Sequence, residues 1–275
     1  IGTHFLNFKS PDLVIKKILR SSISDLICKG VKPKFYFISG SGNKSTFTKN
    51  NLYKISKSLK SEQSKFNIDL CGGDTTFSNK LSFTITSMGY SNKIIYRNKA
   101  KLNDDIYVTG NLGDSYLGLK ALSNKAKFKN KDKLFFIDKY YKPDLPLNLT
   151  KYLLKYANCS IDVSDGLIHD LSKMINRQNL SFHLFENKIP VSKKLSNLIK
   201  KKKLNKINLI SNGDDYQVLF TADIKKARII QRTSKSTGIK ITKIGKIITG
   251  KDRSLIFNEK GKQIRAKSKG YIHRF

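Results

Sequence analysis

Length, composition and charge exclude several classes of protein at the outset. The chain has 275 residues, 39% of them hydrophobic, with 54 Lys and Arg against 20 Asp and Glu, which is enough for one large domain or two ordinary ones with a stable core. No apolar run approaches the roughly 18 residues that a membrane span needs, so the composition indicates a soluble globular protein without a membrane partner.

Helical and strand patterns alternate along the chain, which predicts an α/β fold. The predicted helices cover residues 10–30, 49–65, a segment ending at 122, and then 147–156, 167–176, 193–201 and 223–234. The predicted strands cover residues 34–39, 81–90, 105–109, 160–163, 181–185, 216–221, 240–248 and 254–257. We expect an exposed loop over residues 123–133 and a second structural unit that starts near Asp104.

The formal charge of +34 would suit a nucleic-acid-binding protein, because clustered Lys and Arg neutralise phosphate backbones. The basic residues are scattered, however, and only Lys200 to Lys203 form a run. Frequent Asn and Ile favour a general compositional bias over a dedicated nucleic-acid surface. We therefore expect no nucleic-acid partner and keep a non-catalytic, nucleic-acid-binding protein as an alternative.

The cysteines and the start of the chain bear on its compartment. Cys28, Cys71 and Cys159 are widely spaced, with no C-x-x-C pair and no His at zinc spacing. This usage favours a reducing cytoplasm. The chain opens at Ile1 without an initiator Met or a signal-peptide pattern, and we expect that part of the amino terminus is missing.

Four short segments concentrate acidic side chains next to glycine or serine. They are Ser24-Asp25, Cys71 to Thr76, Asp162 to Gly166, and Gly213 to Tyr216. Divalent metal is the natural explanation in so basic a chain, because Mg²⁺ takes hard oxygen ligands and usually bridges one or two carboxylates to substrate phosphates. The residues alone therefore predict metal-assisted phosphate chemistry.

Each segment also has a purely structural interpretation. Asp165 alone would suit a helix cap. Asp162 and Ser164, however, lie on one face of a strand end, and the three oxygen-bearing side chains together favour contact with metal or phosphate. The paired Gly72-Gly73 is explained best by a hairpin turn. Asp25 is either part of a solvated helix face or a partly buried carboxylate that needs a counter-charge.

Familiar nucleotide-binding motifs are absent from the sequence. Gly42-Asn43-Lys44-Ser45 lacks the glycines of a P-loop, and Gly110-x-x-Gly113 is too short for a dinucleotide fingerprint. If ATP is bound, metal ions must hold it.

Taken in chain order, the segments resemble thiamine-monophosphate kinases, which belong to the superfamily of aminoimidazole ribonucleotide synthetase and selenophosphate synthetase. The resemblance runs from Ile1 to the end of the chain. It rests on Gly2-Thr3-His4-Phe5, Ser24-Asp25-Leu26 with Gly30 and Pro33, Gly72 to Thr76, Val108 to Asp114, Ile161 to Leu167, Gly213 to Phe220, and the terminal Gly270 to Phe275.

The resemblance implies transfer of the ATP γ-phosphoryl group to thiamine monophosphate, with several Mg²⁺ ions, in a homodimer. It implies a two-domain α/β (α+β) fold like that of aminoimidazole ribonucleotide synthetase, with mixed sheets flanked by helices. The amino-terminal domain, over 1–103, would bind ATP and metal and form the dimer; 104–275 would be a second α/β domain.

Residue roles are implied as well. The implied metal ligands are Asp25, Asp74, Asp162 and Asp165; the implied ATP contacts are Gly73, Asp74, Arg97 and Ser164. Asp74, Arg97 and Asp162 would be catalytic, and His4, Asp214 and Tyr271 would contact thiamine monophosphate. A phosphate monoester is largely a dianion at neutral pH, because its second pKa is about 6, so such an acceptor needs no general base.

The sequence departs from the family pattern at several places. Asp214 stands where the family has Glu, Gln217 removes a carboxylate, and Lys29 replaces an apolar residue. The family's amino-terminal Gly-Asp-Asp and Ser-Thr-Asp motifs do not occur before Ile1, so we expect the chain as given to be weakly active or inactive. Another ATP-dependent enzyme of the superfamily, acting on a different acceptor, is the main alternative.

Overall fold

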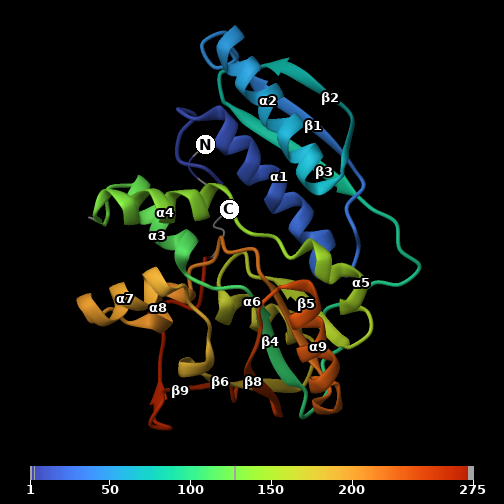
Figure 1. The fold of residues 1–275 in the computed structure, drawn as a ribbon, viewed down its shortest axis with the longest axis vertical. Coiled ribbons are helices and arrows are strands. Elements are labelled where there is room, and N and C mark those ends of the chain that lie inside the picture. Colours follow the sequence, from blue (N-terminus) through green and yellow to red (C-terminus); the bar gives the residue numbers. More distant parts are fainter. Residues whose placement is uncertain (1, 3, 127, 272–275) are drawn as a thin grey trace.

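The computed structural model describes residues 2, 4–126 and 128–271, so Thr3 and residues 272–275 of the terminal motifs lie outside the described residues. The chain forms two mixed sheets flanked by helices, as predicted (Figure 1). Within the described residues, no helix has both the length and the apolar character that crossing a bilayer requires.

The first sheet has three strands in the order β2-β1-β3. β1 (Phe35–Gly42) pairs in parallel with β2 (Asp69–Phe77) and antiparallel with β3 (Ser82–Met88). Helices α1 (Pro11–Cys28) and α2 (Lys49–Phe66) pack together, with α1 against β3. Buried Tyr36 of β1 joins their apolar core, while Phe37, its neighbour on the other face, stays exposed.

The second sheet has seven strands in the order β10-β9-β6-β8-β4-β7-β5. All neighbours are antiparallel except β6 and β9. The strands are β4 (Asp105–Thr109), β5 (Ala157–Asp162), β6 (Leu180–Phe185), β7 (Val218–Ala222), β8 (Ile241–Thr249), β9 (Leu255–Phe257) and β10 (Gln263–Ile264).

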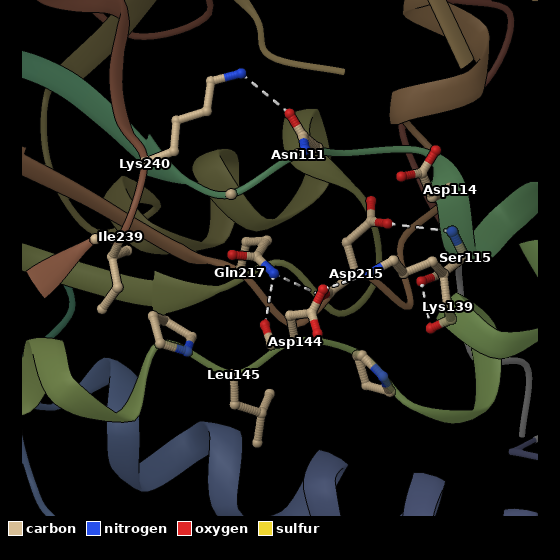
Figure 2. A pocket seen from close by; sticks show the side chains of 14 residues that line it. Asn111, Asp114, Ser115, Lys139, Asp144, Leu145, Asp215, Gln217, Ile239 and Lys240 are labelled. Carbon is tan, nitrogen blue, oxygen red and sulfur yellow. Dashed lines mark hydrogen bonds and ion pairs between the residues drawn. The ribbon is translucent and has the colours of Figure 1, made fainter. Parts of the chain in front are cut away.

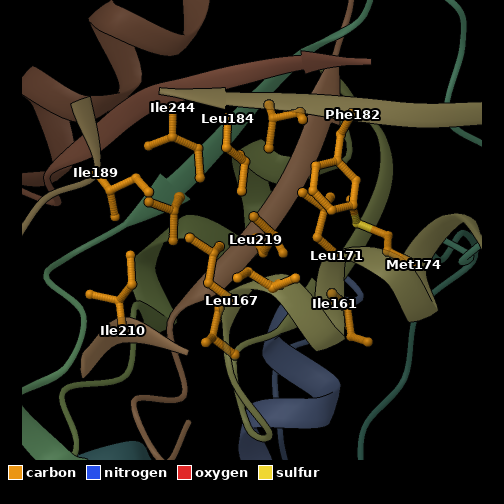
Figure 3. Packing of buried hydrophobic residues seen from close by; sticks show 14 of the residues in the cluster. Ile161, Leu167, Leu171, Met174, Phe182, Leu184, Ile189, Ile210, Leu219 and Ile244 are labelled. Atoms are coloured by element: carbon orange, nitrogen blue, oxygen red, sulfur yellow. The ribbon is translucent and has the colours of Figure 1, made fainter. Parts of the chain in front are cut away.

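Helices flank the second sheet. They are α3 (Asp114–Leu122), α4 (Asn130–Tyr141), α5 (Thr150–Leu153), α6 (Leu167–Ile175), α7 (Lys193–Lys202), α8 (Lys206–Ile210) and α9 (Ala227–Thr237), with short 3₁₀ turns at Leu147–Leu149, Glu186–Lys188 and Ile224–Lys226. Figure 3 shows the main core, in which Leu167 and Leu171 of α6 meet Phe182 of β6 and Leu219 of β7. Burial of this apolar face fixes α6, and hence the loop before it, against the sheet.

Helix α1 touches both parts of the molecule. It packs on α2 and β3, and it also contacts β5 and α4 (Figure 1). The predicted division between residues 103 and 104 falls between β3 and β4. It stays a prediction, because α1 contacts elements on both sides of that division.

Three expected features differ from the structure. Gly72-Gly73 lies inside β2, so the hairpin-turn interpretation is wrong; a Cβ on Gly73 would lie 1.8 Å from the Ile38 carbonyl oxygen, which explains a glycine there. The expected loop over 123–133 is shorter, because α4 begins at Asn130. The expected helix over 147–156 ends at Leu153, because β5 begins at Ala157.

Candidate active site

The carboxyl end of α1 is tied directly to the end of β5. The Ser24 hydroxyl donates to Oδ2 of Asp162 at 2.6 Å. One turn later, Lys29 Nζ donates to the Ser160 carbonyl at 2.6 Å, and the Ser160 hydroxyl donates to the Cys28 carbonyl. These bonds place Asp25, on the same turn as Ser24, beside the buried Asp162.

The pKa values of Asp25 and Asp162 are both raised, mainly by burial. Desolvation, followed by the charge of Asp162, raises the pKa of Asp25 to about 6, although this side chain still reaches solvent. Desolvation also raises the pKa of Asp162. Lys29 and Arg97 oppose the shift at Asp25, so the expected counter-charges are present. Burial nevertheless keeps the pKa of both carboxyl groups raised.

The loop after β5 is held by the segment 213–217. The amide N–H of Asp214 donates to the Ser164 carbonyl, and that of Tyr216 donates to the Val163 carbonyl, both at 2.8 Å. Asp214 and Tyr216 have φ values of +63° and +50°, which are uncommon for residues with a side chain and mark a locally strained segment. The two acidic motifs are therefore one structural unit.

Asp165 does not cap α6, which corrects the capping interpretation. Gly166 is the N-cap, and the Asp165 carboxylate pairs with Lys173. The cap role belongs to Asp170, whose Oδ2 accepts the N–H groups of Asp165 at 2.9 Å and Gly166 at 3.0 Å. Sequence reasoning missed Asp170, although an acid in the first turn of a predicted helix is a recognisable cue.

The residues expected at the thiamine end gather around the same loops. Asp214 Oδ1 lies 2.7 Å from Lys17 Nζ and accepts the Tyr216 hydroxyl at 3.1 Å. The His4 carbonyl accepts the hydroxyl of Tyr140, whose ring centroid lies 3.8 Å from Lys17 Nζ. Lys17 was missed because nothing in the local sequence distinguishes it from the other helix lysines.

Tyr271 reaches the site from the opposite end of the chain. Its amide N–H donates to the Asp165 carbonyl at 2.9 Å. Asp165 thus connects the expected metal end of the site with the expected thiamine end. Five of the expected site residues lie on segments that form or contact the loop after β5, or contact one of its partners: His4, Asp162, Ser164, Asp214 and Tyr271.

Gly73 and Asp74 lie apart from this group, on β2. Asp74 faces Ser39 in the parallel pair, and its Oδ1 accepts the Thr75 N–H at 2.7 Å. Across the described part of the chain, no set of three or more His, Cys, Asp or Glu side chains is arranged to hold a metal ion. The structure does not bring Asp74 to Asp25, Asp162 and Asp165, and its metal role stays a prediction.

Comparison with known proteins shows the family. Residues 2–91 match the family model described as AIR synthase related protein, N-terminal domain. The chain is 33% identical over 248 residues to thiamine-monophosphate kinase of Haemophilus influenzae, covering 90% of this chain and 74% of the relative. It is 34% identical over 278 residues to the enzyme of the same name from Buchnera aphidicola, covering 99% and 84%. The chain belongs to the thiamine-monophosphate kinase family.

Solved structures of thiamine-monophosphate kinases have the same fold. A structure described as AaThiL complexed with AMPPCP and TMP matches with a TM-score of 0.85 and 27% identity, over 100% of this chain and 84% of that one. The enzyme from Stenotrophomonas maltophilia matches with a TM-score of 0.84 and 26% identity, over 96% and 83%. As a member of this family, the chain is a kinase.

A small cavity lined by both polar and apolar residues lies beside this kinase's candidate site (Figure 2). It has a volume of about 240 Å³, and Asp114, Lys139, Asp144 and Asp215 are among its lining residues. Desolvation raises the pKa of Asp114 to about 6 and that of Asp215 to about 8. The cavity is smaller than the ~300 Å³ at which small-molecule sites usually begin.

The donor atoms at Asp25 and Asp162 fit a magnesium ion. They are hard carboxylate oxygens, and desolvation raises the pKa of both groups, so a bound cation would favour their ionised forms. Mg²⁺ needs only one or two protein carboxylates when substrate phosphates and water complete its shell. The absence of a larger acidic set among the described residues is compatible with that mode of binding.

Proposed function

We propose that the chain transfers the γ-phosphoryl group of ATP to thiamine monophosphate, forming thiamine diphosphate and ADP. The observation that carries the proposal is the 33–34% identity to relatives named for this activity over most of the chain. The neighbouring structure described with AMPPCP and TMP supports both reactants. Adjoining segments carry Asp162, Ser164, Asp214 and Tyr271. This arrangement supports binding of both reactants at one site.

The metal end of the proposed site consists of Asp25 and Asp162, with Asp165, paired with Lys173, on the loop that follows β5. Magnesium held there would supply positive charge between two phosphate-bearing reactants. Arg97 lies close enough to Asp25 to lower its pKa, and we propose that it contacts the transferring phosphate, with Ser164 binding ATP. With these roles, the protein contributes to catalysis by aligning the two reactants and neutralising their charge.

The acceptor end of the proposed site is built around Asp214. Its carboxylate is held by Lys17 and Tyr216, so its position is set before any substrate binds. His4 and Tyr271 flank the same loops. We propose that these three residues contact thiamine monophosphate and that the shorter side chain of Asp214, compared with Glu, is compensated by this fixed position.

We also propose a homodimer in the cytoplasm. Phe37, Leu70, Phe77 and Met88 of the first sheet are all exposed, and an apolar patch of this kind favours a protein partner. A second copy on this sheet would also cover β2, which carries Gly73 and Asp74. The three free cysteines are in keeping with a reducing compartment.

The decisive test is a single-turnover assay, which detects even a slow reaction. Purified chain in excess over thiamine monophosphate is mixed with ATP and MgCl₂, and thiamine diphosphate and ADP are separated chromatographically. We expect both products in equal amounts, and their loss in Asp162→Asn. Asp252→Asn, an exposed acid outside the site, is the matched control. ADP without thiamine diphosphate would contradict the proposed acceptor.

A further inference from the structure

A second and larger cavity lies outside the candidate active site. It has a volume of about 650 Å³ and is bounded by α6, β6, the turn between β8 and β9, and the segment 263–269 that leaves β10. This size lies within the ~300–1,000 Å³ range of small-molecule sites. It uses the face of α6 that carries Ile168, Ser172 and Ile175, whereas Lys173 pairs with Asp165.

The floor of this cavity is apolar and is part of the protein core. Ile168, Ile175, Phe182 and Ile256 line it, and each is at most 8% exposed. Figure 3 shows Phe182 close to Met174 in the cluster packed between α6 and the second sheet. Because these side chains are fixed by core packing, the cavity is preformed and offers a rigid apolar surface.

The rim of the cavity is cationic. Lys251, Arg265 and Lys269 are exposed, and the lining includes a single acid, Asp252. Over the described residues, none of these three cations takes part in an ion pair. Basic residues are abundant throughout this chain, so the charge alone does not distinguish the cavity; the apolar floor beneath it does.

Three neutral polar side chains at the cavity, those of Gln178, Ser181 and Ser254, already form hydrogen bonds within the protein. Gln178 bonds to both the N–H and the carbonyl of Ala100. The Ser181 hydroxyl donates to the Gly250 carbonyl at 2.6 Å, and the Ser254 hydroxyl accepts the Phe182 N–H at 3.2 Å. The groups left for a ligand are the apolar floor, the cationic rim and the exposed amides of Asn176 and Gln263.

We propose that this cavity binds a small organic anion with a flat apolar body. The body would lie on Phe182 and Ile256, and the anionic group would meet Arg265 and Lys251. Burial of the ligand's apolar body against the floor gives the affinity, and the cations of the rim favour a ligand with a negative charge. The site is separate from the one proposed for phosphoryl transfer and does not depend on that activity.

Three naphthalene probes of matched shape test the proposal. Binding of naphthalene-2-sulfonate, naphthalene-2-methanol and 2-naphthylmethylammonium to the full chain is measured by isothermal titration calorimetry. We expect the sulfonate to bind at least about tenfold more tightly than the neutral alcohol, which corresponds to about 1.4 kcal/mol, and the ammonium not to bind. Equal binding of sulfonate and alcohol would overturn the proposal.

Two variants locate the binding site. Arg265→Glu should weaken sulfonate binding about tenfold or more, whereas Lys260→Glu, the same charge change in the turn between β9 and β10, should leave it within about twofold. Ser172→Trp, at an exposed position of α6 that lines the cavity, should abolish it, with cooperative urea unfolding confirming the fold. Unchanged binding in Arg265→Glu and Ser172→Trp would show that the anion binds elsewhere.

Discussion

Lys17 of α1 and Asp214 of the segment after α8 form an ion pair, with Nζ 2.7 Å from Oδ1. The lysine side chain is 2% exposed and the aspartate side chain 26%. Burial lowers the pKa of Lys17, and the charge of Asp214 opposes that shift. The pair thus connects the helix that covers the first sheet with the proposed acceptor end of the site.

Removing Lys17 should destabilise the fold because it leaves Asp214 without its cation. We expect Lys17→Met to lower the free energy of unfolding by about 3 kcal/mol, the size typical of breaking a buried pair from one side. The double variant with Asp214→Asn should lose less than the sum of the two single variants. Urea unfolding of the four proteins measures this coupling, and strictly additive losses would contradict it. Lys16→Met, the preceding residue of α1, is the control.

Arg20 and Glu62 form a second buried pair, between α1 and α2. Arg20 Nε and Nη2 donate to the two Glu62 oxygens at 2.7 and 2.9 Å, and Nη1 donates to the Pro143 carbonyl at 3.1 Å. Arg20→Met should cost about 3–5 kcal/mol, because it leaves a buried carboxylate unpaired. Adding Glu62→Leu should recover most of that loss in urea unfolding. A double variant that is less stable than Arg20→Met would contradict this account.

Asp170 holds the loop before α6 through Oδ2, while its buried Oδ1 has no hydrogen-bond partner among the described residues. In Asp170→Asn, the side-chain oxygen can still accept the N–H groups of Asp165 and Gly166. The side-chain NH₂ group then takes the position of Oδ1, which has no partner. We expect Asp170→Asn to change stability by less than about 1 kcal/mol and Asp170→Leu, of similar size, to cost about 2–3 kcal/mol. Thermal unfolding of both variants checks the difference, and equal losses would exclude the capping role.

The sequence predicted those elements whose pattern is local. The strand at 105–109 and the helix at 167–176 were found because each has an apolar face of the right period. β2 was missed because Gly72-Gly73 is typical of a turn, and only pairing with the distant β1 makes it a strand. α4 was missed because lysines precede its apolar residues.

The same distinction holds for the candidate site. Acidic motifs near turns were recognised from their composition, and the family resemblance was confirmed by the comparisons. Lys17 could not be recognised, because its partner Asp214 lies 197 residues later in the chain. A buried lysine and a solvated one look alike in sequence; contacts across the fold make the difference.

Asp215 should make stability depend on pH. Desolvation raises its pKa from 3.8 to about 8 in the folded state, so the folded chain holds a proton that the unfolded chain has lost. Its stabilising contribution is complete below about pH 4 and is lost as pH rises to about 8, at about 1.4 kcal/mol for each pKa unit. Asp215→Asn should therefore flatten the decline in unfolding free energy between pH 4 and pH 8.

The control for this pH dependence is Asp223→Asn, a half-buried residue that caps the 3₁₀ turn at Ile224–Lys226. This variant should shift the whole stability curve without changing its slope. A slope that is the same in the wild-type chain and in Asp215→Asn would contradict the assignment of the effect to Asp215.

Lys29 should tune the two carboxylates at the proposed metal end. Its charge lowers the pKa of both Asp25 and Asp162, and its Nζ is held in place by the Ser160 carbonyl at 2.6 Å. Lys29→Met removes the charge but keeps an apolar stem, so the pKa of Asp25 should rise above its value of about 6. Carboxyl ¹³C NMR titration of Asp25 measures the shift, with exposed Lys32→Met as the control. A pKa that stays the same or falls in Lys29→Met would mean that the ammonium does not act on this pair, and the charge balance of the site would then rest on Arg97.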